Sequence, residues 1–207
     1  LVDTVTHSSD YAERLGAIQG VWQYAAEYVQ KRSVEPADDL TTRLLQSRIG
    51  DRMMSAEETT ASVTLLILGG LDSVSHTMGF IMKFLAENPA HQQALREDPA
   101  SIPDAVNELI RRHSISSTSR RLKQDRVVGG VQMKAGDRIY LGLSLHALDD
   151  RAWEHAQEVQ LKRCPREIMS FGKGNHKCVG MNLARAEITA LLEEWLARVP
   201  PFAVKAS

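Results

Sequence analysis

A cysteine in a glycine-rich stretch is the residue of this sequence best suited to chemistry. Cys178 lies near the end of the run Ser-Phe-Gly-Lys-Gly-Asn-His-Lys-Cys-Val-Gly, which leads directly into an expected helix over residues 182–199. The three glycines of the run permit positive φ angles and a close approach of the backbone to a bound group. The free amides and the dipole of a helix N-terminus favour a thiolate, the form of cysteine that binds metals. Cys178 can therefore serve as a metal ligand, although an inert buried cysteine on a turn is the commoner case for a lone cysteine.

A carboxylate and a guanidinium form a second candidate group. Glu108 and Arg111 are three residues apart within an expected helix over residues 102–112. Residues at this spacing share a helix face, so the two side chains can form a charge-assisted hydrogen bond. Taken alone, the pair fits equally well an exposed ion pair, which stabilises a protein only slightly.

A third group combines two glycines with an acid and an alcohol. Gly69, Gly70, Asp72 and Ser73 lie within the otherwise apolar stretch of residues 63–86. Each glycine inside a helix costs roughly 1 kcal/mol relative to alanine, so the bare backbone indicates that another group approaches it. An acid and a hydroxyl beside such a space can deliver protons. The alternative is a hydroxyl that hydrogen-bonds back to its own helix.

One long helix is expected to position this third group. Ser55 followed by Glu58 is a capping box, so the helix is predicted to begin at Ala56 and to stop before Pro89. Because it is apolar on almost every side, we expect a buried central helix. Its ionisable residues argue against a membrane span.

The remaining elements are predicted from periodicity and from turn residues. Ser101 is expected to cap the helix that carries Glu108. Between residues 121 and 143 the pattern is that of short strands, with turns at Gly129-Gly130 and at Gly136-Asp137. The fold class is therefore mainly α with a small β-sheet, with further helices expected over residues 10–32, 40–46, 89–97 and 182–199. Apolar residues three and four apart predict the buried faces of the first and the last of these helices: Leu15, Ile18, Val21, Trp22, Ala25 and Val29 on the first, and Leu183, Ile188, Leu191, Leu192, Trp195 and Val199 on the last.

Composition excludes several kinds of function. The 207 residues carry 25 Lys and Arg against 26 Asp and Glu, a formal net charge of -1. Binding to nucleic acid or to an anionic membrane needs a basic excess, so neither partner is expected. Two cysteines are too few for a disulfide scaffold and favour a reducing compartment, the cytoplasm. No secretory signal is expected at the start of the sequence, and His7, His91, His146 and His155 show no metal-ligand spacing.

The cysteine-containing run matches the motif F-G-x-G-x-H-x-C-x-G of the cytochrome P-450 family at every fixed position, and so specific a match means that the chain resembles that family. The resemblance implies haem b as the cofactor, with the thiolate of Cys178 as the axial ligand of the iron. It further implies that Phe171 packs beside the sulfur and that His176 bonds a haem propionate. Gly172 and Gly180 belong to the same cofactor-binding motif.

Glu108 and Arg111 are similar to the E-x-x-R element of the same family, in the order and spacing that the family uses. There the pair is a buried structural clamp on the cysteine side of the haem, completed by a second arginine. Arg163 and Arg166 are both candidates for that arginine, and the sequence does not choose between them. By the same resemblance, Arg120 bonds a haem propionate.

The glycine-acid-alcohol segment resembles the oxygen-side helix of the family. The resemblance implies that Gly69 lets the helix approach the porphyrin, and that Asp72 and Ser73 are the catalytic residues that deliver protons. The family more often has threonine where this chain has Ser73. The residues implied to face the substrate are Leu65, Leu68 and Ser116.

The resemblance, particularly to the camphor-hydroxylating bacterial branch, implies a haem-thiolate monooxygenase. It inserts one oxygen atom of O2 into a small apolar substrate, a terpenoid among the candidates, with electrons from NAD(P)H through a reductase and a ferredoxin. Lys173, Lys177 and Arg185 are expected to form a basic patch for an acidic ferredoxin, or else to be ordinary solvated side chains.

The length of the chain supports an alternative. Chains of the family are much longer, so residues 1–207 are interpreted as a single partial domain, the C-terminal haem-binding part, without the N-terminal half and the C-terminal strand hairpin. The missing half is then a further expected partner. The alternative function is a truncated haem-binding or inactive remnant without turnover of its own. A hydrolase using Cys178 and His176 ranks below both, because no oxyanion hole is evident.

Overall fold

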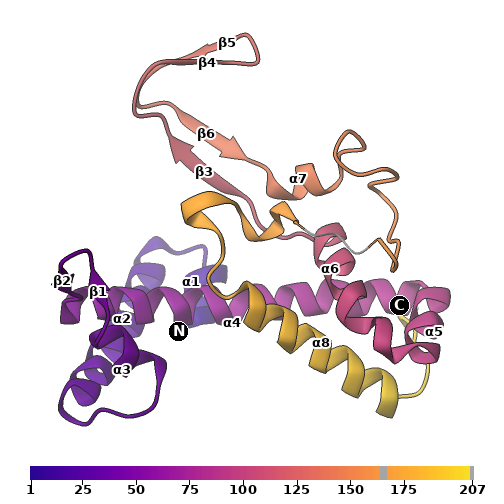
Figure 1. The fold of residues 1–207 in the computed structure, drawn as a ribbon, viewed down its shortest axis with the longest axis horizontal. Helices are drawn as coiled ribbons and strands as arrows, with labels where there is room; N and C mark the ends of the chain where they lie inside the picture. The colour runs from indigo at the N-terminus through magenta and orange to yellow at the C-terminus, as the bar shows by residue number, and fades with distance from the viewer. Residues whose placement is uncertain (164–166, 206–207) are drawn as a thin grey trace. The chain divides into compact units, whose positions relative to one another are not determined.

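The computed structural model describes residues 1–163 and 167–205, so Cys164 and Arg166 lie outside the described residues. The chain divides into two compact units, Leu1–Ser75 and His76–Ser207, and each is described by itself. Helices dominate both units, and short antiparallel hairpins complete them (Figure 1). The predicted fold class, mainly α with a small sheet, is therefore confirmed.

The first unit consists of three helices, a two-stranded hairpin and the first part of a fourth, long helix. Asp10 begins α2 by accepting hydrogen bonds from the amides of Ala12 and Glu13 at 2.7 and 3.3 Å. The short helix α1 and the hairpin of β1 and β2 were not expected from the sequence. The elements are α1 (Val2–His7), α2 (Tyr11–Val34), α3 (Leu40–Leu45), β1 (Arg48–Ile49), β2 (Arg52–Met53) and the first part of α4 (Ala56–Glu87).

The core of this unit joins α2 to α4. Ala25 and Val29 of α2 are buried with Val63 of α4, and Leu44 and Ile67 pack against them. Burial of these side chains holds the two helices together through the hydrophobic effect. The expected apolar stripe of α2 is correct only in part, because three of its residues are about two-fifths exposed, namely Leu15, Ile18 and Trp22.

Helix α4 begins as the sequence predicts. The hydroxyl of Ser55 accepts a hydrogen bond from the amide of Glu58 at 3.1 Å, and the Glu58 carboxylate accepts one from the amide of Ser55 at 2.8 Å. Arg52 adds two hydrogen bonds to the same carboxylate. The bonds from Arg52 and from the amide of Ser55 lower the pKa of Glu58 to about 2. The start of the helix is therefore stabilised by the two reciprocal bonds of the capping box and by the bonds from Arg52.

Much of α4 is exposed, which corrects the expectation of a helix buried on all sides. Leu65, Leu71 and Phe80 are 68%, 60% and 50% exposed, whereas Ile81 and Leu85 near its end are fully buried. Elements of this chain therefore cover α4 along only part of its surface.

Helix α4 is also long and apolar enough, by length and composition, to cross a membrane. Core helices of soluble proteins have the same property, so the observation is weak evidence for a span. Asp72, His76 and Lys83 lie in the helix, and ionisable residues are expensive within hydrocarbon.

The second unit is centred on two packed helices. Buried residues of α6, including Val106 and Leu109, lie with buried Ile188 and Leu192 of α8 in its core. The predicted bounds of α5 and α6 are confirmed, and α8 begins one residue earlier than predicted. The bounds are α5 (Pro89–Glu97), α6 (Ile102–Arg112) and α8 (Met181–Arg198).

Two local expectations about these helices are wrong. Ser101 does not cap α6 with its side chain; its hydroxyl donates to the carbonyl of Asp98 at 2.7 Å instead. On α8, Leu183 is 64% exposed and Trp195 is 39% exposed, although both were expected on the buried face. Leu196 is buried in their place.

The strands of the second unit form two antiparallel pairs, β3 (Thr118–Arg121) with β6 (Arg138–Leu141) and β4 (Arg126–Val128) with β5 (Val131–Met133). The tight turn between β4 and β5 uses Gly129 and Gly130 at φ 57° and 82°. In Figure 1 this second hairpin extends outward from the first. The last predicted strand ends early, because the chain turns into the short helix α7 (Leu143–Ala147).

Candidate functional site

The cysteine loop is attached to α6 at its first residue. Ser170 is buried, and its hydroxyl donates a hydrogen bond to the carbonyl of Ile110 at 3.2 Å. Ile110 lies in the last turn of α6, next to Arg111. The start of the loop is thus fixed to the helix that carries the Glu108–Arg111 pair.

Two glycines let the loop fold back on itself. Gly172 and Gly174 have φ angles of 71° and 66°, and a Cβ atom on Gly172 would lie 3.1 Å from the carbonyl oxygen of His176. The amide of Cys178 can therefore return to donate a 2.8 Å hydrogen bond to the carbonyl of Phe171. Gly180, in contrast, has φ -86° and does not use the positive φ that a glycine permits.

The side chain of Cys178 is exposed just ahead of α8. His176 is exposed as well, and no hydrogen bond joins its ring to the thiol within residues 1–163 and 167–205. An exposed sulfur held by backbone hydrogen bonds at a helix start suits a metal ligand. A Cys-His hydrolase would need the two side chains in contact, which this loop does not provide.

Arg185 lies one turn into α8 and joins the loop to α6 a second time. Its Nε donates to Oδ1 of Asn107 at 2.8 Å, and its guanidinium lies 5.0 Å from the centre of the Phe171 ring. Arg185 is half-buried. The sequence pattern predicts only a basic surface patch for Arg185, because nothing in it links this residue to Asn107.

Glu108 is the centre of a buried ion cluster. Arg111 donates to its carboxylate at 2.7 and 2.8 Å, and Arg163 donates at 3.0 Å. The amide of Gln160 adds a bond at 3.0 Å, and the side chains of Glu108 and Arg111 are fully buried. Of the two arginines that the sequence left open, Arg163 thus binds Glu108, and Arg166 lies outside the described residues.

The environment of Glu108 favours its ionised form. Burial raises the pKa of this carboxyl, but the hydrogen bonds from Arg111, Gln160 and Arg163 outweigh burial, so the pKa lies below its ordinary value. Arg111 also donates to the carbonyls of Ala147, Ala156 and Glu158. Such a cluster is costly to build and strongly destabilising to break, because each partner is left with an unpaired buried charge.

Trp153 lies against the guanidinium of Arg111, a contact that the sequence pattern does not predict. The guanidinium of Arg111 lies 5.5 Å from the centre of its ring, a distance at which a cation and an aromatic face attract each other. A tryptophan in an irregular stretch gives no periodic signal, so only the tertiary fold reveals this contact.

The glycine-acid-alcohol segment lies on α4. No atom lies within 4 Å of a Cβ built on Gly69 or Gly70, so the helix surface is open there. The hydroxyl of Ser73 donates to the carbonyl of Gly69 at 2.6 Å, the local hydrogen bond that the sequence left as an alternative.

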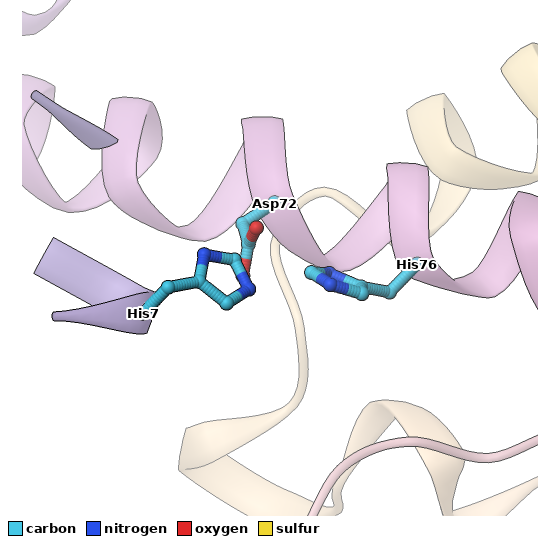
Figure 2. A group of neighbouring side chains, drawn as sticks. All are labelled: His7, Asp72 and His76. Atoms are coloured by element: carbon cyan, nitrogen blue, oxygen red, sulfur yellow. The ribbon is translucent and has the colours of Figure 1, made fainter. Parts of the chain in front are cut away.

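Asp72 has a neighbour that the sequence did not predict. Figure 2 shows the ring of His7, from the end of α1, beside the carboxylate of Asp72, and the nearest ligand atoms lie within 4.8 Å. His76 follows Asp72 one turn later on the same helix. His7 is distant in sequence from α4 and lies in an element that was itself unexpected, so spacing alone could not have indicated the pair.

The other predicted residues are divided between the two units. Arg120 on β3 is half-buried and donates to the hydroxyl of Thr118 and the carbonyl of Ser119, both at 2.8 Å. Ser116 is half-buried in the same unit. Leu65 is exposed and Leu68 half-buried on α4, in the first unit.

The expected basic patch on the loop is weaker than its sequence indicates. Lys173 lies 3.6 Å from the carboxylate of Glu167, in an exposed ion pair. Arg185 is engaged by Asn107 and Phe171, which leaves Lys177 as an exposed cation of the loop.

Comparison with known proteins identifies the family. The family model described as cytochrome P-450 matches residues 7–199. The chain is 34% identical over 193 residues to a probable cytochrome P-450 127A1 of Sinorhizobium fredii, an alignment that covers 93% of this chain and 47% of the relative. It is 30% identical over 203 residues to nocardicin C N-oxygenase of Nocardia uniformis subsp. tsuyamanensis, covering 97% and 50%.

A solved structure agrees with these relatives. The crystal structure of cytochrome P-450 CYP101C1 is similar with a TM-score of 0.88 and 36% identity, over 94% of this chain and 50% of that one. The chain thus spans about half the length of the relatives it matches. With a family match over almost all of its residues and a fold shared with a solved member, this chain belongs to the cytochrome P-450 family.

Proposed function

We propose that this chain is the haem-binding half of a cytochrome P-450 monooxygenase, with the thiolate of Cys178 as the axial ligand of the iron. The cofactor of the family is haem b. The observation that carries the proposal is the exposed sulfur of Cys178 on a loop fixed by the Phe171 carbonyl and by Ser170. Thiolate is the ligand that favours cleavage of the O–O bond when the haem is bound.

The surrounding residues fit such a cofactor. The exposed ring of His176 and the guanidinium of Arg120 are donors of the kind that bind propionate carboxylates. The Glu108 cluster stabilises the helix to which the cysteine loop is attached. The open surface at Gly69 admits a flat ring and a small gas molecule to α4.

Proton delivery falls to Asp72 and Ser73. Insertion of one oxygen atom of O2 into a C–H bond releases the other atom as water and consumes two electrons and two protons. The carboxyl of Asp72 takes up and releases these protons, while the Ser73 hydroxyl is held in one orientation by the Gly69 carbonyl. His7, beside Asp72, supplies a second titratable group to the same part of α4.

The substrate proposed is a small apolar molecule, a terpenoid among the candidates, that contacts Leu65, Leu68 and Ser116. One relative carries the name nocardicin C N-oxygenase. Electrons come from NAD(P)H through a reductase and an acidic ferredoxin that meets Lys173 and Lys177. We propose that the protein is located in the cytoplasm.

A second candidate function is haem binding without turnover. The observation in its favour is the exposure of Leu65 and Leu71 on α4. A closed substrate pocket beside α4 would require other parts of the fold to cover these side chains. In this case the remaining half of the fold is a required partner, because the chain spans about half of its relatives.

A reduced-CO difference spectrum of the chain reconstituted with haem tests the ligand. We expect the long-wavelength Soret band of a haem thiolate, and we expect Cys178→Ser to abolish it. Cys164→Ser, the same change at the other cysteine, is the matched control and should preserve the band. Persistence of the band in Cys178→Ser would overturn the ligand assignment.

The role of Asp72 is tested by Asp72→Asn. The variant should form product more slowly while its haem content stays unchanged, because the amide cannot exchange protons with the oxygen site. Haem content is measured from the absorbance of the extracted cofactor. Loss of haem in this variant would show that Asp72 is structural.

A further inference from the structure

The cysteine loop is joined to α6 on both sides of Phe171. Before Phe171, the hydroxyl of Ser170 bonds the carbonyl of Ile110. After the loop, Arg185 of α8 bonds Asn107, one turn earlier on α6. Because the Phe171 carbonyl accepts the hydrogen bond from the amide of Cys178, a shift of Phe171 shifts the cysteine backbone as well.

Arg185 acts on Phe171 directly. Its guanidinium lies 5.0 Å from the centre of the ring, within the range of a cation–π attraction. Within the described ranges no carboxylate forms an ion pair with Arg185. Its Nε donates a hydrogen bond to the neutral side-chain amide of Asn107. The positive charge is therefore held over the aromatic face, and no acid among the described residues neutralises it.

We propose that Arg185, tethered by Asn107, is a positioning residue that holds Phe171, and through it the backbone of Cys178, in the geometry of the metal ligand. The proposal rests on the proposed function for the role of Cys178. The tether itself is a property of the chain without cofactor, so the two can be tested separately.

Arg198 offers a matched comparison on the same helix. It lies in the last turn of α8 and forms an exposed ion pair with Glu194, four residues earlier. Loss of this guanidinium removes a charge from α8 without touching the loop. An effect that is specific to the cysteine loop should therefore appear in Arg185→Gln and be absent from Arg198→Gln.

Hydrogen exchange of the haem-free chain is the first test, because the Cys178 amide is itself hydrogen-bonded to Phe171. Arg185→Gln and Asn107→Leu should each speed exchange at this amide by roughly fivefold, the factor that about 1 kcal/mol of local stability represents. The amide of Ala184, which bonds Gly180 within the first turn of α8, should keep its wild-type rate. Arg198→Gln should leave both amides unchanged.

The second test uses the reconstituted chain. In Arg185→Gln, a smaller share of the bound haem should give the thiolate Soret band in the reduced-CO spectrum, and Arg185→Lys should recover the band in part, since it keeps the charge but not the bond geometry. Unchanged exchange at Cys178 in both tether variants would overturn the proposal. Equal acceleration at Cys178 and Ala184 would also overturn it, by showing general fraying of α8. Absence of the thiolate band in the wild type would overturn the ligand assignment while leaving the exchange result interpretable.

Discussion

At the scale of single residues, the buried carboxylate of Glu108 connects parts of the chain that lie far apart in the sequence. It binds Arg111 on its own helix and Arg163 from the irregular stretch before the cysteine loop. Helix α6 thus organises the second unit through side chains that are both charged and buried. Such groups stabilise only as a complete set, because each desolvated charge depends on the others.

Glu108→Gln should therefore be strongly destabilising. The amide leaves the charges of Arg111 and Arg163 without their acidic partner, and breaking a buried pair in this way costs about 3 to 5 kcal/mol. Urea unfolding followed by circular dichroism measures the loss. Glu194→Gln removes an exposed acid from a pair with Arg198 and should change the free energy of unfolding little. Similar losses in the two variants would contradict the importance of burial.

His113 makes a prediction about pH. Its ring lies 5.2 Å from that of Phe84, and its Nε2 is buried with no hydrogen-bond partner in the described residues. Burial, with the charges of Arg112 and Arg111, lowers the pKa of this imidazole to about 4. The unfolded chain therefore binds a proton at a higher pH than the folded chain does. The stability that neutral His113 contributes is present above the unfolded pKa of about 6.5 and is lost as the pH falls towards 4.

His113→Phe keeps a ring against Phe84 and removes the titration. The difference in free energy of unfolding between the variant and the wild type should grow in favour of the variant as the pH is lowered from about 7 to about 5. Urea unfolding at both pH values measures it. A pH-independent difference for His113→Phe would rule out this origin of acid sensitivity.

At the scale of elements, the long helices, the short helix α3 and the β4–β5 hairpin could be predicted from the sequence, whereas α1, the β1–β2 hairpin and α7 could not. The capping box and the apolar run determine the start of α4, and Pro89 sets the start of α5. Helix α1 and the β1–β2 hairpin are too short for a periodic pattern to emerge. Helix α7 occupies apolar residues that alternate as a strand would, so local pattern and tertiary structure disagree there.

The candidate site divides in the same way. The motif around Cys178 and the spacing of Glu108 and Arg111 are local, and both are readable in the sequence. The choice of Arg163, the tether of Arg185 and the neighbour of Asp72 depend on contacts between segments distant in sequence. Single-sequence patterns carry no information on such contacts, so these residues emerge only with the fold.

The cysteine loop offers an element-scale prediction from a pair of glycines. Gly172→Ala and Gly174→Ala both place a side chain at positive φ, which costs roughly 1 kcal/mol or more. Only Gly172→Ala also brings a Cβ to 3.1 Å from the His176 carbonyl, whereas Gly174 has open space. Gly172→Ala should therefore retain less haem after gel filtration than Gly174→Ala. Equal retention would show that the turn can widen at no cost.

At the scale of the whole molecule, two observations agree: the chain matches about half the length of its relatives, and α4 exposes apolar side chains. The chain covers 47% of one relative and 50% of another, and its longest helix leaves Leu65 and Leu71 exposed. Apolar surface of this kind is usually covered by another part of a fold or by a partner. The proposed catalytic role of α4 therefore depends on cover that the described residues do not supply.

The exposed side of α4 should bind a hydrophobic dye and promote self-association. Leu65, Leu68 and Leu71 are spaced three apart, so each lies beside the next on the helix surface. Together the three leucines form an apolar strip. Leu145 on α7 is as exposed as Leu65 but has no such neighbours along its own short helix. Leu65→Gln and Leu71→Gln should therefore each lower dye fluorescence and shift sedimentation towards the monomer, whereas Leu145→Gln should do so less. If all three changes act equally, exposure of single leucines accounts for the association, and the strip on α4 has no special role.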